Sequence, residues 1–472
     1  MKNRIIAMLL TLALVLALPI STLAEDMPKG EPPQGMGEPP QGMGQPPERP
    51  DGMGEPPQGG MPGGPGGQSA DFEYAAVETI TEAAELTDLT TTSTAANECA
   101  VMVDTDQSVT LINPSVSKTG DSDGGDSCNF YGLNAAVLVM GGAETTITGG
   151  EITSDADGAN GVFCYGGNGA RNGGEGDGST VNIADTVITT MGDGSGGIMT
   201  TGGGVTNASN LTIVTSGRSS AAIRTDRGGG IVTVDGGSYT TNGLGSPAIY
   251  STADITVSNA TLTSNLSEGV CIEGKNSITL NDCAMTASNT QCNGNATFLD
   301  TIMIYQSMSG DADSGTSSFT MNGGSLTSLN GHMFHVTNTN AIISLNAVAL
   351  NNADAANVLL SVCDDGWNGA DNVATLNAAN QALNGTILVG DNATFTLNLT
   401  EGSTFEGAIS GEITNAKGET VSTEIGNVTV TLDSTSTWTL TADTYITAFE
   451  GDAANVNANG YTLFVNGEAL VG

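Results

Sequence analysis

The chain has 472 residues, of which 66 are glycine, 51 are aspartate or glutamate and only 11 are lysine or arginine. The formal charge of -40 argues against nucleic acid and anionic membrane surfaces as partners, because a polyanion gains no attraction from such a protein. Aromatic residues make up 4% of the chain. Glycine is present at about twice its average share of ~7%, a composition that disfavours a large helical globule.

The first 24 residues have the features of a secretory signal peptide. Lys2 and Arg4 precede an apolar run over 5–18, and small residues surround the expected cleavage point after Ala24. No later stretch is long and apolar enough to predict a membrane span. We therefore expect a secreted protein that is extracellular or associated with the cell surface.

A segment rich in proline, glycine and methionine follows over residues 25–70. The unit Gly-Glu-Pro-Pro-Gln-Gly-Met occurs at 30–36 and again at 37–43, and then decays. Such a composition cannot bury a core, so we predict a disordered linker.

From residue 71 the chain repeats a short pattern in which two apolar residues flank four variable positions, often with glycine or asparagine among them. The first apolar residues are spaced by roughly 21 to 26 positions, apart from insertions, which is typical of a solenoid built from stacked coils. Short β segments with Gly, Asn, Asp and Ser between them predict an all-β, right-handed parallel β-helix over 71–410, with closing coils and a cap over 411–472. The first apolar residues are Ile147, Ile183, Val234, Val257, Leu280, Met321, Leu345, Leu376 and Leu397.

A further strand in each coil supplies the candidate binding face. Because side chains alternate along a strand, Ile223 and Thr225 are predicted to point inward and Arg224 and Asp226 outward. Insertions at 166–178, 307–317 and 364–372 follow this strand, and insertions along one edge of a solenoid mark its binding side. The predicted outward column is Met199, Arg224, Tyr250, Cys271, Met303 and His335.

The coil pattern and a C-terminal passage at 434–444, Ser-Thr-Ser-Thr-Trp-Thr-Leu-Thr-Ala-Asp-Thr, carry a resemblance. The region from about residue 85 to 472 resembles the β-helical bodies of bacterial surface adhesins and autotransporter passengers. It is also similar to secreted bacterial β-helix carbohydrate-binding domains, whose members attach to plant polysaccharide and hold calcium. No translocating barrel follows in this sequence, so the resemblance does not imply autotransporter export. A function taken from it is analogy from the fold.

Three loops place two aspartates two residues apart beside a glycine. A tight loop can aim such a pair at one point, as a calcium ion with its 6 to 8 oxygen ligands requires. None of the loops continues into the complete twelve-residue EF-hand pattern, so solvated turn residues remain the alternative. The candidate calcium ligands are Asp121, Asp123, Asp155, Asp157, Asp311 and Asp313.

A second set of residues is the candidate ligand-binding face. Aromatic rings exposed on a rigid sheet can stack on sugar rings, and basic residues are rare enough in this chain for an outward arginine to be informative. Ordinary packing beneath the loops is the alternative explanation of the aromatic residues. The set comprises Arg224, Asp226, Tyr250, Glu273, Lys275, Tyr305 and Trp367.

Catalysis is the less favoured interpretation of the same residues. Parallel β-helix lyases and pectin hydrolases use an outward Arg or Lys with carboxylates, and Arg224 with Glu273 would fit that role. The paired Asp, Gly-His-Gly and Arg-x-Lys motifs of pectin hydrolases are missing, however, and an anionic substrate would be repelled. We therefore assign no catalytic residue.

Two remaining patterns concern threonine and cysteine. A threonine follows the second apolar residue in most coils and is predicted to face solvent; such arrays can bind ice, but the unequal coil lengths disfavour this. The seven cysteines leave at least one unpaired, and Cys99 with Cys128, about one coil apart, is a candidate disulfide. The threonines are Thr153, Thr189, Thr215, Thr240, Thr263, Thr286 and Thr327.

From the sequence we expect a secreted, non-catalytic β-helix adhesin or carbohydrate-binding protein. Its partner would be a polysaccharide, or a glycan or protein of a host or cell surface, and calcium would stabilise it. A β-helix polysaccharide lyase or glycoside hydrolase is one alternative, and a structural component of the cell envelope is another.

Overall fold

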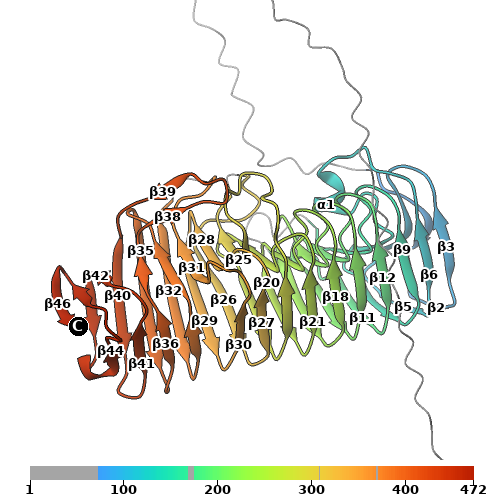
Figure 1. Ribbon diagram of the computed structural model, residues 1–472. Coiled ribbons are helices and arrows are strands. Elements are labelled where there is room, and N and C mark those ends of the chain that lie inside the picture. The colour runs from blue at the N-terminus through green and yellow to red at the C-terminus, as the bar shows by residue number, and fades with distance from the viewer. Residues whose placement is uncertain (1–72, 168–174, 308, 368–369) are drawn as a thin grey trace, which may run out of the picture. The chain divides into compact units, whose positions relative to one another are not determined.

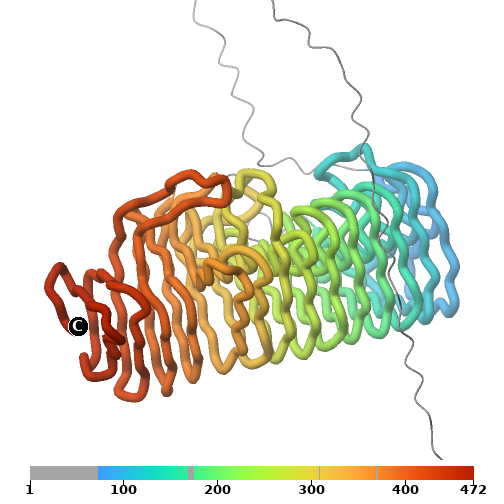
Figure 2. The backbone as a smooth tube through the Cα atoms, viewed as in Figure 1, coloured from blue at the N-terminus to red at the C-terminus, as the bar shows by residue number. Residues whose placement is uncertain are grey.

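The structure, a computed structural model, describes residues 73–167, 175–307, 309–367 and 370–472. The predicted signal peptide and linker lie outside these residues. From residue 73 the chain coils into a parallel β-helix, and its successive coils build three long sheets, here called A, B and C (Figures 1 and 2). The predicted all-β parallel solenoid is therefore confirmed. No helix within the described ranges is long and apolar enough to cross a membrane.

Sheet A opens each coil and carries the candidate binding face. Its thirteen strands pair in parallel, each with the equivalent strand of the next coil. The strands are β1 (Ala75–Ile80), β4 (Glu98–Asp104), β7 (Val137–Met140), β10 (Val162–Tyr165), β13 (Ile198–Thr201), β16 (Ile223–Thr225), β19 (Ile249–Ser251), β22 (Val270–Glu273), β25 (Asp300–Tyr305), β28 (His332–Thr337), β31 (Val358–Val362), β34 (Thr386–Val389) and β37 (Ile409–Ser410).

Sheet B follows sheet A in each coil and has fourteen parallel strands. They are β2 (Ala84–Thr87), β5 (Ser108–Ile112), β8 (Glu144–Thr148), β11 (Thr180–Ala184), β14 (Gly204–Ser209), β17 (Gly230–Asp235), β20 (Asp254–Ser258), β23 (Ser277–Asn281), β26 (Thr316–Asn322), β29 (Asn340–Asn346), β32 (Asn372–Ala379), β35 (Ala393–Thr400), β40 (Asn427–Leu432) and β43 (Ala448–Glu450).

Sheet C closes each coil with ten parallel strands of four residues each. They are β3 (Thr90–Ser93), β6 (Ser115–Lys118), β9 (Glu151–Ser154), β12 (Val187–Thr190), β15 (Thr212–Thr215), β18 (Ser238–Thr241), β21 (Thr261–Ser264), β24 (Ala284–Ala287), β27 (Ser325–Ser328) and β30 (Ala349–Asn352).

Smaller elements complete the C-terminal coils. A four-stranded parallel sheet takes the position after sheet B in these coils, an antiparallel pair follows β37, and a three-stranded sheet ends the chain. The elements are β33 (Ala382–Asn384), β36 (Thr404–Gly407), β41 (Thr437–Leu440) and β44 (Val456–Asn457); β38 (Ile413–Thr414) and β39 (Thr420–Ser422); β42 (Thr444–Ile446), β45 (Leu463–Val465) and β46 (Glu468–Val471); and the helices α1 (Ser127–Tyr131) and η2 (Ala453–Asn455).

The corner between sheets B and C is two residues long, and its first residue has a positive φ in coil after coil. Glycine, asparagine and aspartate tolerate this left-handed conformation better than other residues, which explains why they recur at this spacing. Ala347, with φ 54°, is the exception because its side chain gives no local hydrogen bond in return. The other corner residues are Asp88, Asn113, Gly149, Asp185, Asn210, Gly236, Asn259, Asp282 and Gly323, and Asn380 takes the equivalent position before β33.

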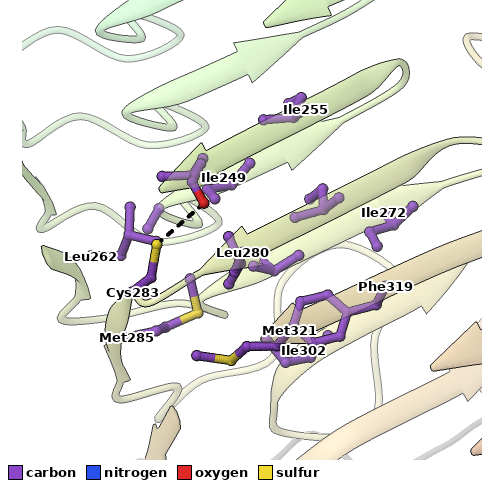
Figure 3. Packing of buried hydrophobic residues seen from close by; sticks show 14 of the residues in the cluster. Ile249, Ile255, Leu262, Ile272, Leu280, Cys283, Met285, Ile302, Phe319 and Met321 are labelled. Atoms are coloured by element: carbon purple, nitrogen blue, oxygen red, sulfur yellow. Dashed lines mark hydrogen bonds between the residues drawn. The ribbon is translucent and has the colours of Figure 1, made fainter. Parts of the chain in front are cut away.

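Columns of inward apolar side chains fill the interior of the coils. Val257, Leu280 and Met321 pair in register on successive strands of sheet B, and residues of sheets A and C pack against them (Figure 3). The predicted register holds from Ile147 to Leu345 and then slips by two residues, because Leu345 pairs with Ala378 rather than Leu376. Hydrophobic spacing could not reveal this slip, since both residues point inward.

The predicted threonine column on sheet C is correct with one exception. Val214 occupies the column in β15, whereas Thr215 pairs with Thr190 and Thr241 and is buried. Every strand of sheet C has the same length, so the insertions lie elsewhere in the coils. Unequal coil lengths are therefore no argument against ice binding by this face. A face of small residues alone, however, specifies no ligand.

Candidate functional site

The outward column of sheet A has the predicted register. Met199 pairs with Arg224, Arg224 with Tyr250, and Tyr250 with Cys271. The column continues through Met303 to His335, and the next strand adds Ser361. Residues that are up to 32 positions apart in the sequence therefore lie on neighbouring strands.

The expectation that this face is open to solvent is wrong. Met199, Cys271, Met303 and His335 are all buried. Helix α1 and loops that precede or follow the strands of sheet A form a second layer. Three separate apolar clusters fill the space between that layer and the sheet. We call the outer surface of sheet A together with this layer the covered face. Alternation predicted the direction of these side chains correctly, but it carries no information about what lies above them.

Arg224 and Asp226 form an ion pair on the covered face. Their side chains meet at 2.8 Å and are 13% and 5% exposed. The guanidinium of Arg224 also lies over the ring of Tyr250, 5.6 Å from its centroid, and donates to the backbone oxygen of Ser219. Burial raises the pKa of Asp226 to about 6 despite the neighbouring Arg224. The pair ties β16 to the loops that precede and follow it.

Glu273 is the centre of a buried hydroxyl network. The hydroxyls of Tyr250 and Tyr305 donate to one carboxylate oxygen, and those of Ser307 and Ser309 donate to the other. Burial raises the pKa of both tyrosines well above the usual value, so they remain donors at neutral pH. Glu273 is 1% exposed and both of its oxygens have partners, so this carboxylate anchors the loop after β25 and is shielded from a bound substrate.

The other two predicted ligand residues differ in position. The Trp367 ring packs against that of Tyr305, with centroids 4.9 Å apart, and belongs to the same cluster. Lys275 lies apart from that cluster and forms a solvent-exposed ion pair with Asp313 at 2.8 Å. The structure therefore brings six of the seven predicted ligand residues onto the covered face and leaves Lys275 at its edge.

The predicted calcium loops use their aspartates in several ways. Asp121 and Asp157 each accept a hydrogen bond from a backbone amide of the following coil, at 2.9 and 2.8 Å. Asp123 accepts from the side chain of Asn97, whereas Asp155 is exposed. Asp121 and Asp157 therefore join successive coils at a corner of the solenoid.

The third loop directs its aspartates at separate cations. Asp311 pairs with Arg227, whose guanidinium also lies over Phe130 of α1, and Asp313 pairs with Lys275. Within the described residues, no three or more His, Cys, Asp or Glu side chains are arranged to hold a metal ion. Calcium at these loops stays a prediction.

Sequence reasoning missed two polar residues that border an open groove beside Arg224. The groove has a volume of about 210 Å³, and its lining includes Arg224, Tyr250, Pro247 and Asn293. At its edge the exposed Arg218 donates to the side-chain oxygen of Asn293 at 3.2 Å. Arg218 and Asn293 are 75 residues apart in the sequence, and Asn293 lies in an insertion before β25, so no local pattern connects them.

Two histidines of β28 share one serine. The Nδ1 atoms of His332 and His335 each lie 2.7 Å from Oγ of Ser361, and Nε2 of His335 lies 3.3 Å from Asp365. The Phe298 ring stacks on His335 with centroids 4.6 Å apart. This order of groups resembles a nucleophilic relay, but His335 and Ser361 are both fully buried, which favours a structural role.

The C-terminal cap exposes aromatic rings that the sequence reasoning did not single out. Tyr445 is 51% exposed, and its ring stacks on Phe464 with centroids 4.6 Å apart and planes within 4° of parallel. A cavity of about 350 Å³ borders Tyr445, and Asp391, Asn427 and Asn466 contribute to its lining. An exposed ring beside polar groups is an arrangement that suits sugar binding.

The candidate disulfide between Cys99 and Cys128 is not formed. All seven cysteines are free thiols, and only Cys292 is less than fully buried. The Cys99 thiol instead lies 3.4 Å from the backbone oxygen of Gly132. Burial raises the pKa of Cys99 and of Cys164 to about 12.

Comparison with known proteins gives no relative. No protein-family model matches the chain, and neither the curated proteins nor the solved structures contain a significant match.

Proposed function

We propose that this chain is a secreted, non-catalytic carbohydrate-binding protein or adhesin. The observation that carries the proposal is the groove beside Arg224, where arginine, tyrosine and asparagine side chains meet at an open concave surface. Planar guanidinium and amide groups next to an aromatic ring offer hydrogen bonds and a stacking surface to a sugar. The groove is smaller than the ~300–1,000 Å³ of typical small-molecule sites, which fits a shallow subsite for one unit of a polymer.

Binding without catalysis is favoured by the state of the nearby carboxylates. Asp226 and Glu273 are the acidic groups nearest to Arg224 and Tyr250 along sheet A, and both are buried. A general acid or base must come within hydrogen-bond reach of the reacting atoms. Asp226 is committed to Arg224 and to the backbone amide of Arg227, and Glu273 to four hydroxyls, so neither is presented to the groove.

The test is retention of the mature chain on immobilised plant and mucin polysaccharides, with the supernatant assayed for released sugar. Arg218→Ala and Asn293→Ala alter the groove without touching the Tyr250–Glu273 contact. Lys417→Ala is the matched control for Arg218→Ala, because it also removes one exposed positive charge. We expect retention without sugar release, and at least a tenfold weaker affinity for the groove variants than for the control.

A second variant separates the groove from the C-terminal cap. Tyr445→Ala removes the exposed ring beside the cap cavity. Loss of retention in this variant alone would move the binding site to the cap. Sugar release by the unmodified chain would favour the lyase or hydrolase alternative, and a lack of retention on every glycan would contradict the carbohydrate-binding proposal.

A further inference from the structure

Two buried carboxyl groups lie on neighbouring coils at the start of sheet A. Val270 of β22 pairs with Ile302 of β25, and the amide of Gly269 donates to the oxygen of Thr301 at 2.7 Å. Counting back two residues from the first pair places Glu268 beside Asp300. Adjacent strands are ~4.8 Å apart, so the two side chains begin within about that distance of each other.

Neither carboxyl group has a cationic partner among the described residues. Glu268 is 6% exposed and Asp300 is 1% exposed, and neither takes part in any ion pair within those residues. Burial and the carboxylates of Glu268 and Asp365 raise the pKa of Asp300 well above its usual range. Two buried like charges on adjacent strands require a proton or a positive ion between them.

Asn289, in the loop between β24 and β25, connects Glu268 to the backbone of Asp300. Its side-chain nitrogen donates to Glu268 at 3.3 Å and to the backbone oxygen of Asp300 at 3.2 Å. Asn289 is 1% exposed, and its side-chain oxygen has no hydrogen-bond partner. Both carboxyl oxygens of Asp300 also lack a partner. Three buried oxygen atoms on two adjoining side chains are therefore unsatisfied, where buried polar groups are nearly always bonded.

We propose that Glu268, Asp300 and the side-chain oxygen of Asn289 form a buried binding site for a hard divalent cation such as Ca²⁺. Carboxylate and amide oxygens are the ligands that Ca²⁺ prefers, and the ion would satisfy the three unpartnered oxygens together. A proton shared between Asp300 and Glu268 would also remove the charge conflict, but it would leave the side-chain oxygen of Asn289 without a partner. The site shares no residue with the groove or with the three aspartate loops, and it contains only two carboxylates.

The ion would connect segments that the strand ladder does not connect. Asn289 lies in the insertion that precedes β25, the same loop that carries Asn293 of the groove and Phe298 above His335. Fixing Asn289 against Glu268 and Asp300 would hold this loop over the covered face. We therefore expect the ion to stabilise the fold without taking part in glycan contact.

The test measures metal content and thermal stability of the mature chain after refolding from urea, either in chelator or in Ca²⁺ followed by gel filtration. Refolding is needed because a buried ion exchanges slowly. We expect one Ca²⁺ per chain and a melting temperature several degrees higher with Ca²⁺ than with chelator. Asp300→Asn should abolish both effects, whereas Asp123→Asn and Asp313→Asn, which change the predicted calcium loops, should keep both.

Two results would overturn the proposal. The first is a wild-type chain that contains no metal and melts at the same temperature with Ca²⁺ and with chelator, a comparison that does not depend on any variant folding. The second is an Asp300→Asn chain that retains the metal. A higher melting temperature of this variant in chelator, together with the first result, would assign a shared proton to the two carboxyl groups instead.

Discussion

Replacing Met199 by Ala tests whether the outer surface of sheet A is covered. Met199 is 0% exposed and belongs to the cluster that includes Phe163 of the neighbouring strand and Phe130 of α1. The substitution removes three heavy atoms from a filled space, and buried Met→Ala changes cost 2–5 kcal/mol. We expect a loss of about 3 kcal/mol in the free energy of unfolding.

Met191→Ala is the matched control, because that side chain is 49% exposed. An exposed substitution changes stability by at most about 0.5 kcal/mol. Urea unfolding followed by circular dichroism compares the two variants, with the slopes checked because solenoids can unfold in more than one step. Equal midpoints for Met199→Ala and Met191→Ala would refute the second layer and restore the open face expected from the sequence.

Three further predictions concern the corner, the thiols and a histidine. Ala347→Gly should stabilise the protein by about 0.5–1 kcal/mol, since glycine relieves the positive φ at a modest entropic cost; an unchanged urea midpoint would contradict this. A thiol reagent should modify at most Cys292 in the native protein and seven cysteines in urea, so rapid native reaction of a second thiol would show that the core thiols are accessible. Burial lowers the pKa of His332 to about 3, below its unfolded value of about 6.5, so the unfolded state binds more protons between these values and stability should fall as pH decreases through this range. His332→Asn, which can still form a hydrogen bond with Ser361, should reduce that pH dependence, and an unchanged slope in urea titrations from pH 7 to 4 would argue against a neutral imidazole at this position.

The coil architecture could be predicted from the sequence because each coil repeats the same pattern of inward apolar residues and corner residues. Inward apolar residues such as Val257 and Leu280 recur in sequence, and the corner residues have the types that a positive φ requires. The direction of Arg224 and Tyr250 follows from alternation alone. The slip at Leu376 could not be predicted, since a shift of two residues keeps the same face inward.

The candidate site was harder to predict because its contacts join distant loops. The register placed Tyr250 and Glu273 on one face, but only the structure shows Ser307 and Ser309 closing over Glu273. Arg218 meets Asn293 across 75 residues through an insertion that has no repeat pattern. Irregular insertions determine which parts of the sheet reach solvent, and periodicity cannot describe them.

The corner aspartates also bear on how such a chain can change length. Asp121 accepts from the amide of Asp157, Asp157 from that of Asp193, and Asp193 from that of Arg218. Each of these aspartates thus accepts a hydrogen bond from the equivalent backbone amide of the next coil. Removing or duplicating one complete coil would rejoin equivalent partners and leave every other coil's bonds unchanged. Evolution can therefore lengthen the solenoid by copying coils while the irregular loops over sheet A diverge, which separates growth of the scaffold from change in its binding surface.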